Sequence, residues 1–318
     1  MQKSSEVKQE AIRVSELIAQ NKQKKSVSNL VEKLIPTILF LLASITILTT
    51  LGILYTLLSQ AIQLFLKLYQ FGSFFTGTVL KPLSQNPEFG ILPLINGTLI
   101  STAIAMLVAG PIGLMSAIYL SEYASEKVRR ILKPLLEILA GVPTIVYGFF
   151  AFTFVTPLIR SIFPEVGATN ILSPGLVMGV MIIPMIASLS EDAMTSVPNA
   201  MREGSLAMGA TKLETTLKVV IPAAFSGIIA SFVLGISRAI GETMIVTIAS
   251  GSSKNVTFDI TESMQTMTAY IVEVAGGEAA AGSTIYYSLY AVAITLFVFT
   301  LVMNLLARYI SRKFREEY

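Results

Sequence analysis

Two oppositely charged residues, Arg238 and Glu242, lie four positions apart in an otherwise apolar stretch of this 318-residue chain. On a helix that spacing places both side chains on one face, with about 5–6 Å between their Cβ atoms. A guanidinium offers a planar fork of N–H donors that matches the oxygens of a phosphate-like anion. We therefore expect Arg238 to meet a passing anion, while Glu242 holds the guanidinium in position and limits trapping of the anion. The alternative is a structural ion pair that joins two helices.

A second pattern is the polar segment 203–222, EGSLAMGATKLETTLKVVIP, which lies between two apolar runs. Pro198 suits the first position of a short helix, where a missing N–H costs nothing. Gly209 suits the left-handed residue that ends such a helix, and Thr211 with Glu214 forms a capping box that begins another. The pattern predicts a helix, a tight turn and a second helix.

Small side chains surround the predicted turn, and they let the backbone of a partner approach closely, as when a helix docks in a groove. We therefore expect this segment to contact another protein; a plain elbow between two membrane spans is the alternative. The residues expected at the contact are Glu203, Gly204, Ser205, Ala207, Gly209, Ala210 and Pro222.

The elements that must position these residues are long apolar runs. The chain is 53% hydrophobic and 14% charged, which is not the composition of a soluble globular protein. A membrane-spanning helix needs about 20 mostly apolar residues. An isolated charge at the bilayer centre costs at least about 2.5–3.5 kcal/mol, so Arg238 is expected to face the bundle interior and to be paired. We predict an all-α polytopic membrane protein with six transmembrane helices, at residues 36–58, 92–119, 134–159, 172–189, 223–249 and 285–307.

The basic residues predict the orientation of these spans. With the N-terminus inside, 18 of the 23 Lys and Arg residues fall in cytoplasmic segments, as the positive-inside rule requires. Both termini are therefore expected in the cytoplasm. The predicted parts are a cytoplasmic arm (1–33), in which residues 21–25 interrupt a helical pattern, a six-helix domain (34–310) with a cytoplasmic loop at about 191–221, and a short basic tail (311–318).

Several chemistries are excluded by residues that the chain lacks. It has no cysteine and no histidine, so disulfides, thiolate metal sites and histidine proton relays are absent, and we expect no cofactor or metal. The segment Gly277–Thr284 has the glycine spacing of a phosphate loop without its lysine, so ATP must be bound by another chain. The net charge of +3 reflects topology and gives no reason to expect nucleic acid as a partner.

Several segments resemble one known family. Glu203 and Gly209, followed by Val219-Val220-Ile221-Pro222, resemble the "EAA" loop of ABC importer permeases, with Gly204-Ser205 in place of two alanines. The segments 141–150, 181–194 and 237–246 resemble the permease subunits of the phosphate-specific ABC importer. The segment 90–102 and the N-terminal arm favour its C-type subunits, the PstC family. The resemblance covers about residues 34–310.

This resemblance implies a type I ABC importer permease fold and a function. The chain would be a subunit without enzymatic activity that moves inorganic phosphate inward across a bacterial cytoplasmic membrane. Its partners would be an A-type phosphate permease subunit in a heterodimer, two ATPase subunits and an external phosphate-binding protein. The 198–217 loop would be the coupling helix that sits in a cleft of the ATPase. The outer segments 59–90 and 250–282 would receive the binding protein.

Three alternatives stay open from the residues alone. The first keeps the class and changes the cargo to sulfate, molybdate or another oxyanion. The second is a secondary carrier driven by protons or sodium, against which stand the absence of histidine and the shortage of intramembrane carboxylates, with Glu137 and Glu242 the obvious candidates. The third is a membrane sensor or scaffold that uses the 1–33 arm as its output.

Overall fold

The computed structural model describes residues 2–67, 70–84, 86–277 and 279–313. The chain divides into two compact units, Met1–Thr56 and Leu57–Tyr318. The basic tail expected at 311–318 lies for the most part outside the described residues.

The first unit consists of one element. Helix α1 (Gln2–Lys67) begins here and ends in the second unit. The expected interruption at residues 21–25 is wrong, because the helix continues through them, and lysine and glutamine are good helix formers. Its apolar part, Leu34–Leu66, is long enough to cross a membrane. The hydroxyl of Ser44 donates to the carbonyl of Phe40 at 2.7 Å, which satisfies a polar group within an apolar helix.

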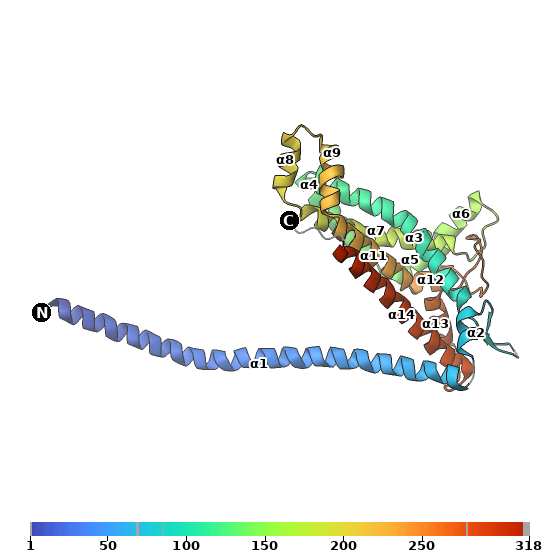
Figure 1. Cartoon of the computed structure of the whole chain (residues 1–318), viewed down its shortest axis with the longest axis horizontal. Helices are drawn as coiled ribbons and strands as arrows, with labels where there is room; N and C mark the ends of the chain where they lie inside the picture. The colour runs from blue at the N-terminus through green and yellow to red at the C-terminus, as the bar shows by residue number, and fades with distance from the viewer. Residues whose placement is uncertain (1, 68–69, 85, 278, 314–318) are drawn as a thin grey trace. The chain divides into compact units, whose positions relative to one another are not determined.

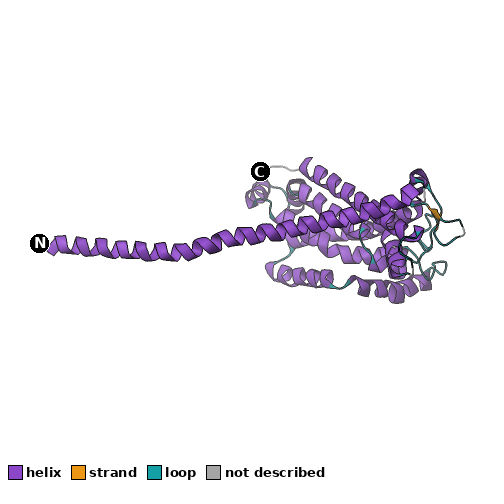
Figure 2. Cartoon of the chain, turned by 90° about the horizontal axis from the view of Figure 1, so that it is seen from below, coloured by secondary structure: helices purple, strands orange, loops and turns teal. Residues whose placement is uncertain are grey.

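The second unit is a bundle of helices with one small hairpin (Figures 1 and 2). Three of its helical segments, labelled η, are π-helical turns. In chain order the elements are α2 (Phe71–Thr76), β1 (Leu80–Lys81), β2 (Glu88–Phe89), α3 (Leu92–Ile118), η1 (Tyr119–Tyr123), α4 (Glu126–Gly141), α5 (Thr144–Phe150), η2 (Ala151–Val155), α6 (Thr156–Ile162), α7 (Leu172–Thr195), α8 (Asn199–Ala207), α9 (Lys212–Thr215), η3 (Thr216–Val220), α10 (Ile221–Ala223), α11 (Phe225–Ile240), α12 (Met244–Ala249), α13 (Met267–Gly276) and α14 (Thr284–Lys313).

The centre of the bundle is the packing of α3 against α7, with α11 against both. Glycine allows the first two helices to approach closely. A Cβ atom added at Gly179 of α7 would lie 2.8 Å from the Cβ of Val108 and 2.9 Å from the carbonyl oxygen of Ala105. Small residues at such positions let membrane helices pack backbone to backbone. These contacts fix α3 and α7, the helices that lead to η1 and to α8, against each other.

The expected spans are correct in type and differ in their limits. Five described helices are long and apolar enough to cross a membrane, or six if the pair Lys212–Ala223 and Phe225–Ile240, bent by 71°, is one span. The third span begins at Thr144 instead of residue 134, because α4 is a separate amphipathic helix that ends at Gly141, just before Val142 and Pro143. Proline biases the residue before it away from helical geometry.

The fifth span is also not one continuous helix. The sequence predicts it at 223–249, but α11 ends at Ile240 and α12 begins at Met244. Gly241 to Thr243 form a break between them. The carboxylate of Glu242 accepts hydrogen bonds from the first backbone N–H groups of α12, and this cap stabilises the new helix start.

Residues 251–265 form a segment without helix or strand. Other parts of the unit hold its backbone in place. The side chain of Asn96 donates to the carbonyl of Thr257 at 2.5 Å, and the N–H of Gly167 donates to the carbonyl of Thr261 at 3.0 Å.

Candidate coupling loop and anion pathway

Helix α8, the turn after it and α9 form the helix-turn-helix that the sequence predicts. Gly209 has a φ of +89°, the left-handed conformation expected of it. Its N–H donates to the carbonyl of Leu206 at 3.0 Å, and that of Ala210 donates to the carbonyl of Ser205 at 3.2 Å. This pair of bonds is the Schellman motif that closes a helix end. The turn is therefore specified locally.

The start of α9 also follows the sequence pattern. The Thr211 hydroxyl accepts from the N–H of Glu214 at 3.2 Å, and the Glu214 carboxylate accepts from the N–H of Thr211 at 2.9 Å. Both bonds of the predicted capping box are thus present. Pro198 lies one position earlier than expected, since it precedes the first helical residue, Asn199. The hydroxyls of Ser205 in α8 and Thr215 in α9 form a hydrogen bond of 2.9 Å, which joins the two helices.

The surface of this loop is open and partly apolar. A Cβ atom added at Gly204 would have no atom within 4 Å apart from its neighbours along the helix. The packing of this chain therefore does not require a small residue at that position. Glu203, Ala207, Gly209 and Pro222 are exposed, and Ser205 and Ala210 are half-buried.

Three exposed apolar side chains at this surface were not among the expected contact residues. Met208 is 89% exposed, Leu213 57% and Leu206 48%. The sequence signal for these three residues is a large apolar side chain within a polar loop. Exposed apolar side chains that cluster on a surface mark interaction sites.

Arg238 and Glu242 are close together, but not on one helical face. Arg238 belongs to the last turn of α11, whereas Glu242 lies in the break before α12. Their side chains form an ion pair with 3.8 Å between Nη2 and Oε2, and they are 46% and 2% exposed. The sequence thus predicts the pair but not the broken helix that arranges it.

The two members of the pair are held very differently. The Glu242 carboxylate accepts from the N–H groups of Met244 and Ile245 at 3.0 and 3.4 Å, and its carbonyl accepts from the Thr268 hydroxyl at 2.6 Å. Arg238 meets Glu242 at a distance longer than a hydrogen bond. A fixed, buried carboxylate therefore stands beside a guanidinium that is about half exposed.

Comparison with known proteins identifies the family and the fold of this chain. The sequence profile of the family described as "Binding-protein-dependent transport system inner membrane component" matches residues 109–316. The chain belongs to this family. The match includes the helix-turn-helix of α8 and α9 as well as Arg238 and Glu242, so both candidate sites lie within the matched residues.

Curated relatives of this permease cover most of its length. A "Probable ABC transporter permease protein YqgH" from Bacillus subtilis is 35% identical over 76% of this chain and 77% of its own. A "Phosphate transport system permease protein PstC" from Mesorhizobium japonicum is 34% identical over 84% of this chain and 86% of its own. A "Probable phosphate transport system permease protein PstC" from Methanocaldococcus jannaschii is 30% identical over 72% and 77%.

Solved permease structures share the fold. A bacterial ABC transporter involved in the import of the acidic polysaccharide alginate matches with a TM-score of 0.61 and 15% identity, over 87% of this chain and 96% of that one. The MetNI methionine ABC transporter matches with a TM-score of 0.53 and 18% identity, over 71% and 95%. At these identities the likeness shows the architecture of an ABC importer permease and nothing about cargo.

Proposed function

We propose that this permease moves inorganic phosphate into the cell as the C-type subunit of an ATP-driven importer. The observation that carries the proposal is the pair Arg238–Glu242, in which a half-exposed guanidinium stands beside a buried, fixed carboxylate. The guanidinium fork matches phosphate oxygens, and the adjacent negative charge keeps the anion from binding too tightly to leave. The names of the curated relatives, which include several phosphate transport permeases, support this cargo.

The proposed assembly follows the permease class. An A-type permease subunit pairs with this chain, two ATPase subunits bind on the cytoplasmic side, and an external phosphate-binding protein delivers cargo. The loop at about 191–221 receives the ATPase, whose closing moves the spans and opens the phosphate pathway outward. Both termini are cytoplasmic, as are the arm at 1–33 and the tail at 311–318, because most basic residues then lie inside.

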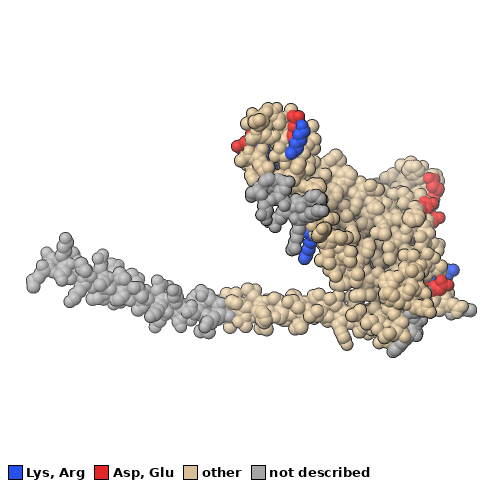
Figure 3. Space-filling model, in the orientation of Figure 1, with Lys and Arg blue, Asp and Glu red and all other residues tan. Residues whose placement is uncertain are grey.

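Residues 251–265 are the proposed landing surface for the binding protein, and their properties support that role. Their backbone is held in place, yet Phe258 is 81% exposed. Asp259 and Glu262 are exposed, as is Glu165 in the neighbouring segment after α6, and Figure 3 shows acidic side chains along the edge of the second unit that carries α6. An acidic surface repels a free anion, so it suits delivery of phosphate by a protein rather than capture from solution.

Uptake in cells tests the cargo. In cells whose only high-affinity phosphate route is this complex, we expect labelled phosphate to enter, and excess unlabelled sulfate or molybdate to leave its rate unchanged. The reason is that hydrogen-bond donors held in fixed positions bind an anion whose charge and shape match them better than one that does not match. If sulfate or molybdate abolishes the phosphate signal or enters in its place, the permease belongs to another oxyanion.

A further inference from the structure

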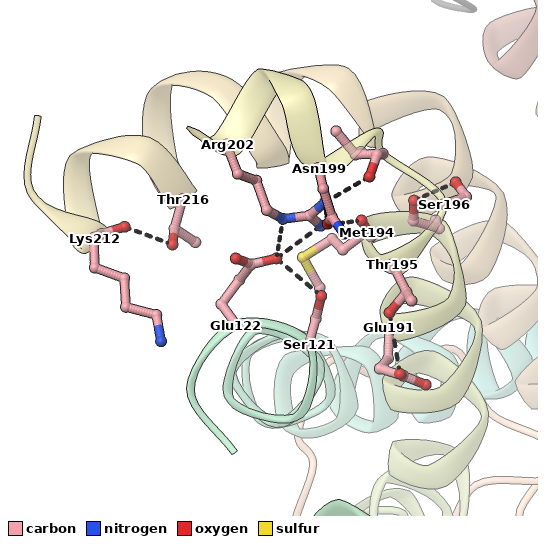
Figure 4. A network of polar contacts seen from close by, with 12 residues as sticks. Ser121, Glu122, Glu191, Met194, Thr195, Ser196, Asn199, Arg202, Lys212 and Thr216 are labelled. Carbon is pink, nitrogen blue, oxygen red and sulfur yellow. Dashed lines mark hydrogen bonds and ion pairs between the residues drawn. The ribbon is translucent and has the colours of Figure 1, made fainter. Parts of the chain in front are cut away.

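Arg202 joins three elements at the cytoplasmic end of the bundle (Figure 4). It belongs to α8, and its Nη2 lies 3.0 Å from a carboxylate oxygen of Glu122 in η1. The same nitrogen donates to the carbonyl of Met194 in α7 at 2.7 Å. Its Nη1 donates to the carbonyl of Val197 at 2.5 Å and to the side chain of Asn199 at 3.3 Å. One guanidinium therefore binds α8, η1 and the end of α7 together.

Glu122, which pairs with Arg202, is largely buried, as is Arg202 itself. The side chains of Arg202 and Glu122 are 17% and 7% exposed, and the Ser121 hydroxyl donates to the same Glu122 oxygen at 3.0 Å. Glu122 lies in η1, a π-helical turn that directly continues α3. Such turns are uncommon and are frequent at functional sites. A sheltered ion pair of this kind resists exchange with water, unlike a surface pair.

A second set of ion pairs extends the connection to α4. Glu191 of α7 is completely buried and pairs with Arg129 and Lys133 of α4. The distance from Lys133 Nζ to the Glu191 carboxylate is 2.7 Å, and this hydrogen bond raises the pKa of Lys133. Lys133 therefore stays charged at physiological pH. The cytoplasmic end of α7 is thus bound to α4 by one set of charges and to α8 and η1 by Arg202.

We propose that Arg202 is the positioning residue that transmits movement of the coupling loop to α3 and α7 at once. This inference rests on the proposed role of the loop as the ATPase contact. A displacement of α8 pulls on Glu122 and on the carbonyl of Met194 through a single side chain, so the α3–α7 pair moves as a unit. Met201 of α8 also packs against the apolar cluster that includes Met194 and Val220, so Arg202 adds the directional polar bonds to an apolar contact. Residues along such a connection change coupling without contacting any ligand.

The test compares transport with ATP hydrolysis in the purified, reconstituted complex. Arg202→Gln is expected to retain ATPase co-purification and ATP hydrolysis, while phosphate moved per ATP falls about tenfold. Arg202→Lys keeps the positive charge, but an ammonium lacks the planar set of donors that binds all four acceptors of Arg202. We expect it to move an intermediate amount of phosphate per ATP. The matched control is Arg130→Gln, because Arg130 is 84% exposed and lies 4.0 Å from Glu126. It is expected to behave as wild type.

Two further measurements separate transmission from folding and from cargo. The permease has no cysteine, so the double variant Glu122→Cys, Arg202→Cys contains a single pair of thiols that a short bis-maleimide can cross-link. We expect this cross-link to restore the amount of phosphate moved per ATP. The labelling rate of Ser196→Cys, an exposed position directly after α7, is expected to change on ATP addition only when Arg202 is intact. This readout does not depend on cargo, so a failed phosphate assay with an intact labelling response overturns the proposed cargo alone.

Three results would overturn the inference. The first is an Arg202→Gln complex that matches wild type in both transport per ATP and labelling response. The second is loss of ATPase co-purification in that variant, which would make Arg202 part of the docking surface instead. The third is a cross-linked pair that remains uncoupled.

Discussion

Replacing Arg238 by glutamine is expected to lower phosphate uptake about 10- to 100-fold, because hydrogen bonds from a charged donor contribute about 1.5–3 kcal/mol and each 1.4 kcal/mol is tenfold. The amount of assembled complex is expected to stay unchanged, since the Arg238 side chain is 46% exposed and meets Glu242 at 3.8 Å. Initial uptake rates at equal membrane levels measure the effect.

The partner of Arg238 is expected to behave differently. Glu242→Gln keeps an oxygen that can accept from the first N–H groups of α12 but removes the negative charge beside the guanidinium. We expect this variant to bind phosphate more tightly and to release it more slowly, so KM and maximal rate fall together. Arg160→Gln, at an exposed arginine near the end of α6, is the control and is expected to transport normally. Normal transport by Arg238→Gln would make the pair architectural.

Replacing Met208 by aspartate is expected to abolish ATPase co-purification while the permease itself still folds. Met208 is 89% exposed, so its own chain gains little from it, but docking would bury it against the ATPase. Burying an unpaired carboxylate costs several kcal/mol, enough to dissociate most complexes. Quantitative pull-down with a tagged ATPase subunit measures the loss.

The control for Met208→Asp is a substitution at an apolar residue of similar exposure on another surface. Leu83, at the hairpin between β1 and β2, is 85% exposed, and Leu83→Asp is expected to retain the ATPase. If Met208→Asp also retains it, the α8–α9 turn is an elbow between two spans, and the ATPase binds elsewhere.

Local signals in the sequence were sufficient to predict the turn between α8 and α9. Gly209 and the Thr211–Glu214 capping box act within a few residues, so backbone sterics and short hydrogen bonds specify the turn without help from the rest of the chain. The apolar runs likewise predict membrane-spanning helices, because the bilayer requires a minimum apolar length.

Long-range contacts could not be predicted from the same sequence. The break at Gly241–Thr243 depends on the carboxylate of Glu242 turning to cap α12, whereas an (i, i+4) spacing by itself indicates a continuous helix. The bond between Arg202 and Glu122 joins residues 80 positions apart, and no local pattern marks that pairing. Sequence spacing therefore predicted that Arg238 and Glu242 pair and missed the arginine that connects α8 to the bundle.

Proteoliposomes that contain the purified complex of this permease, its partner permease and two ATPase subunits show most directly whether the permease imports phosphate. We predict that labelled phosphate accumulates inside them only when ATP and the external binding protein are present. We also predict that sulfate and molybdate do not accumulate in its place, and that Arg238→Gln lowers phosphate accumulation at least about tenfold. Accumulation of another oxyanion in place of phosphate, or phosphate accumulation that needs neither ATP nor the binding protein, would contradict the proposed function.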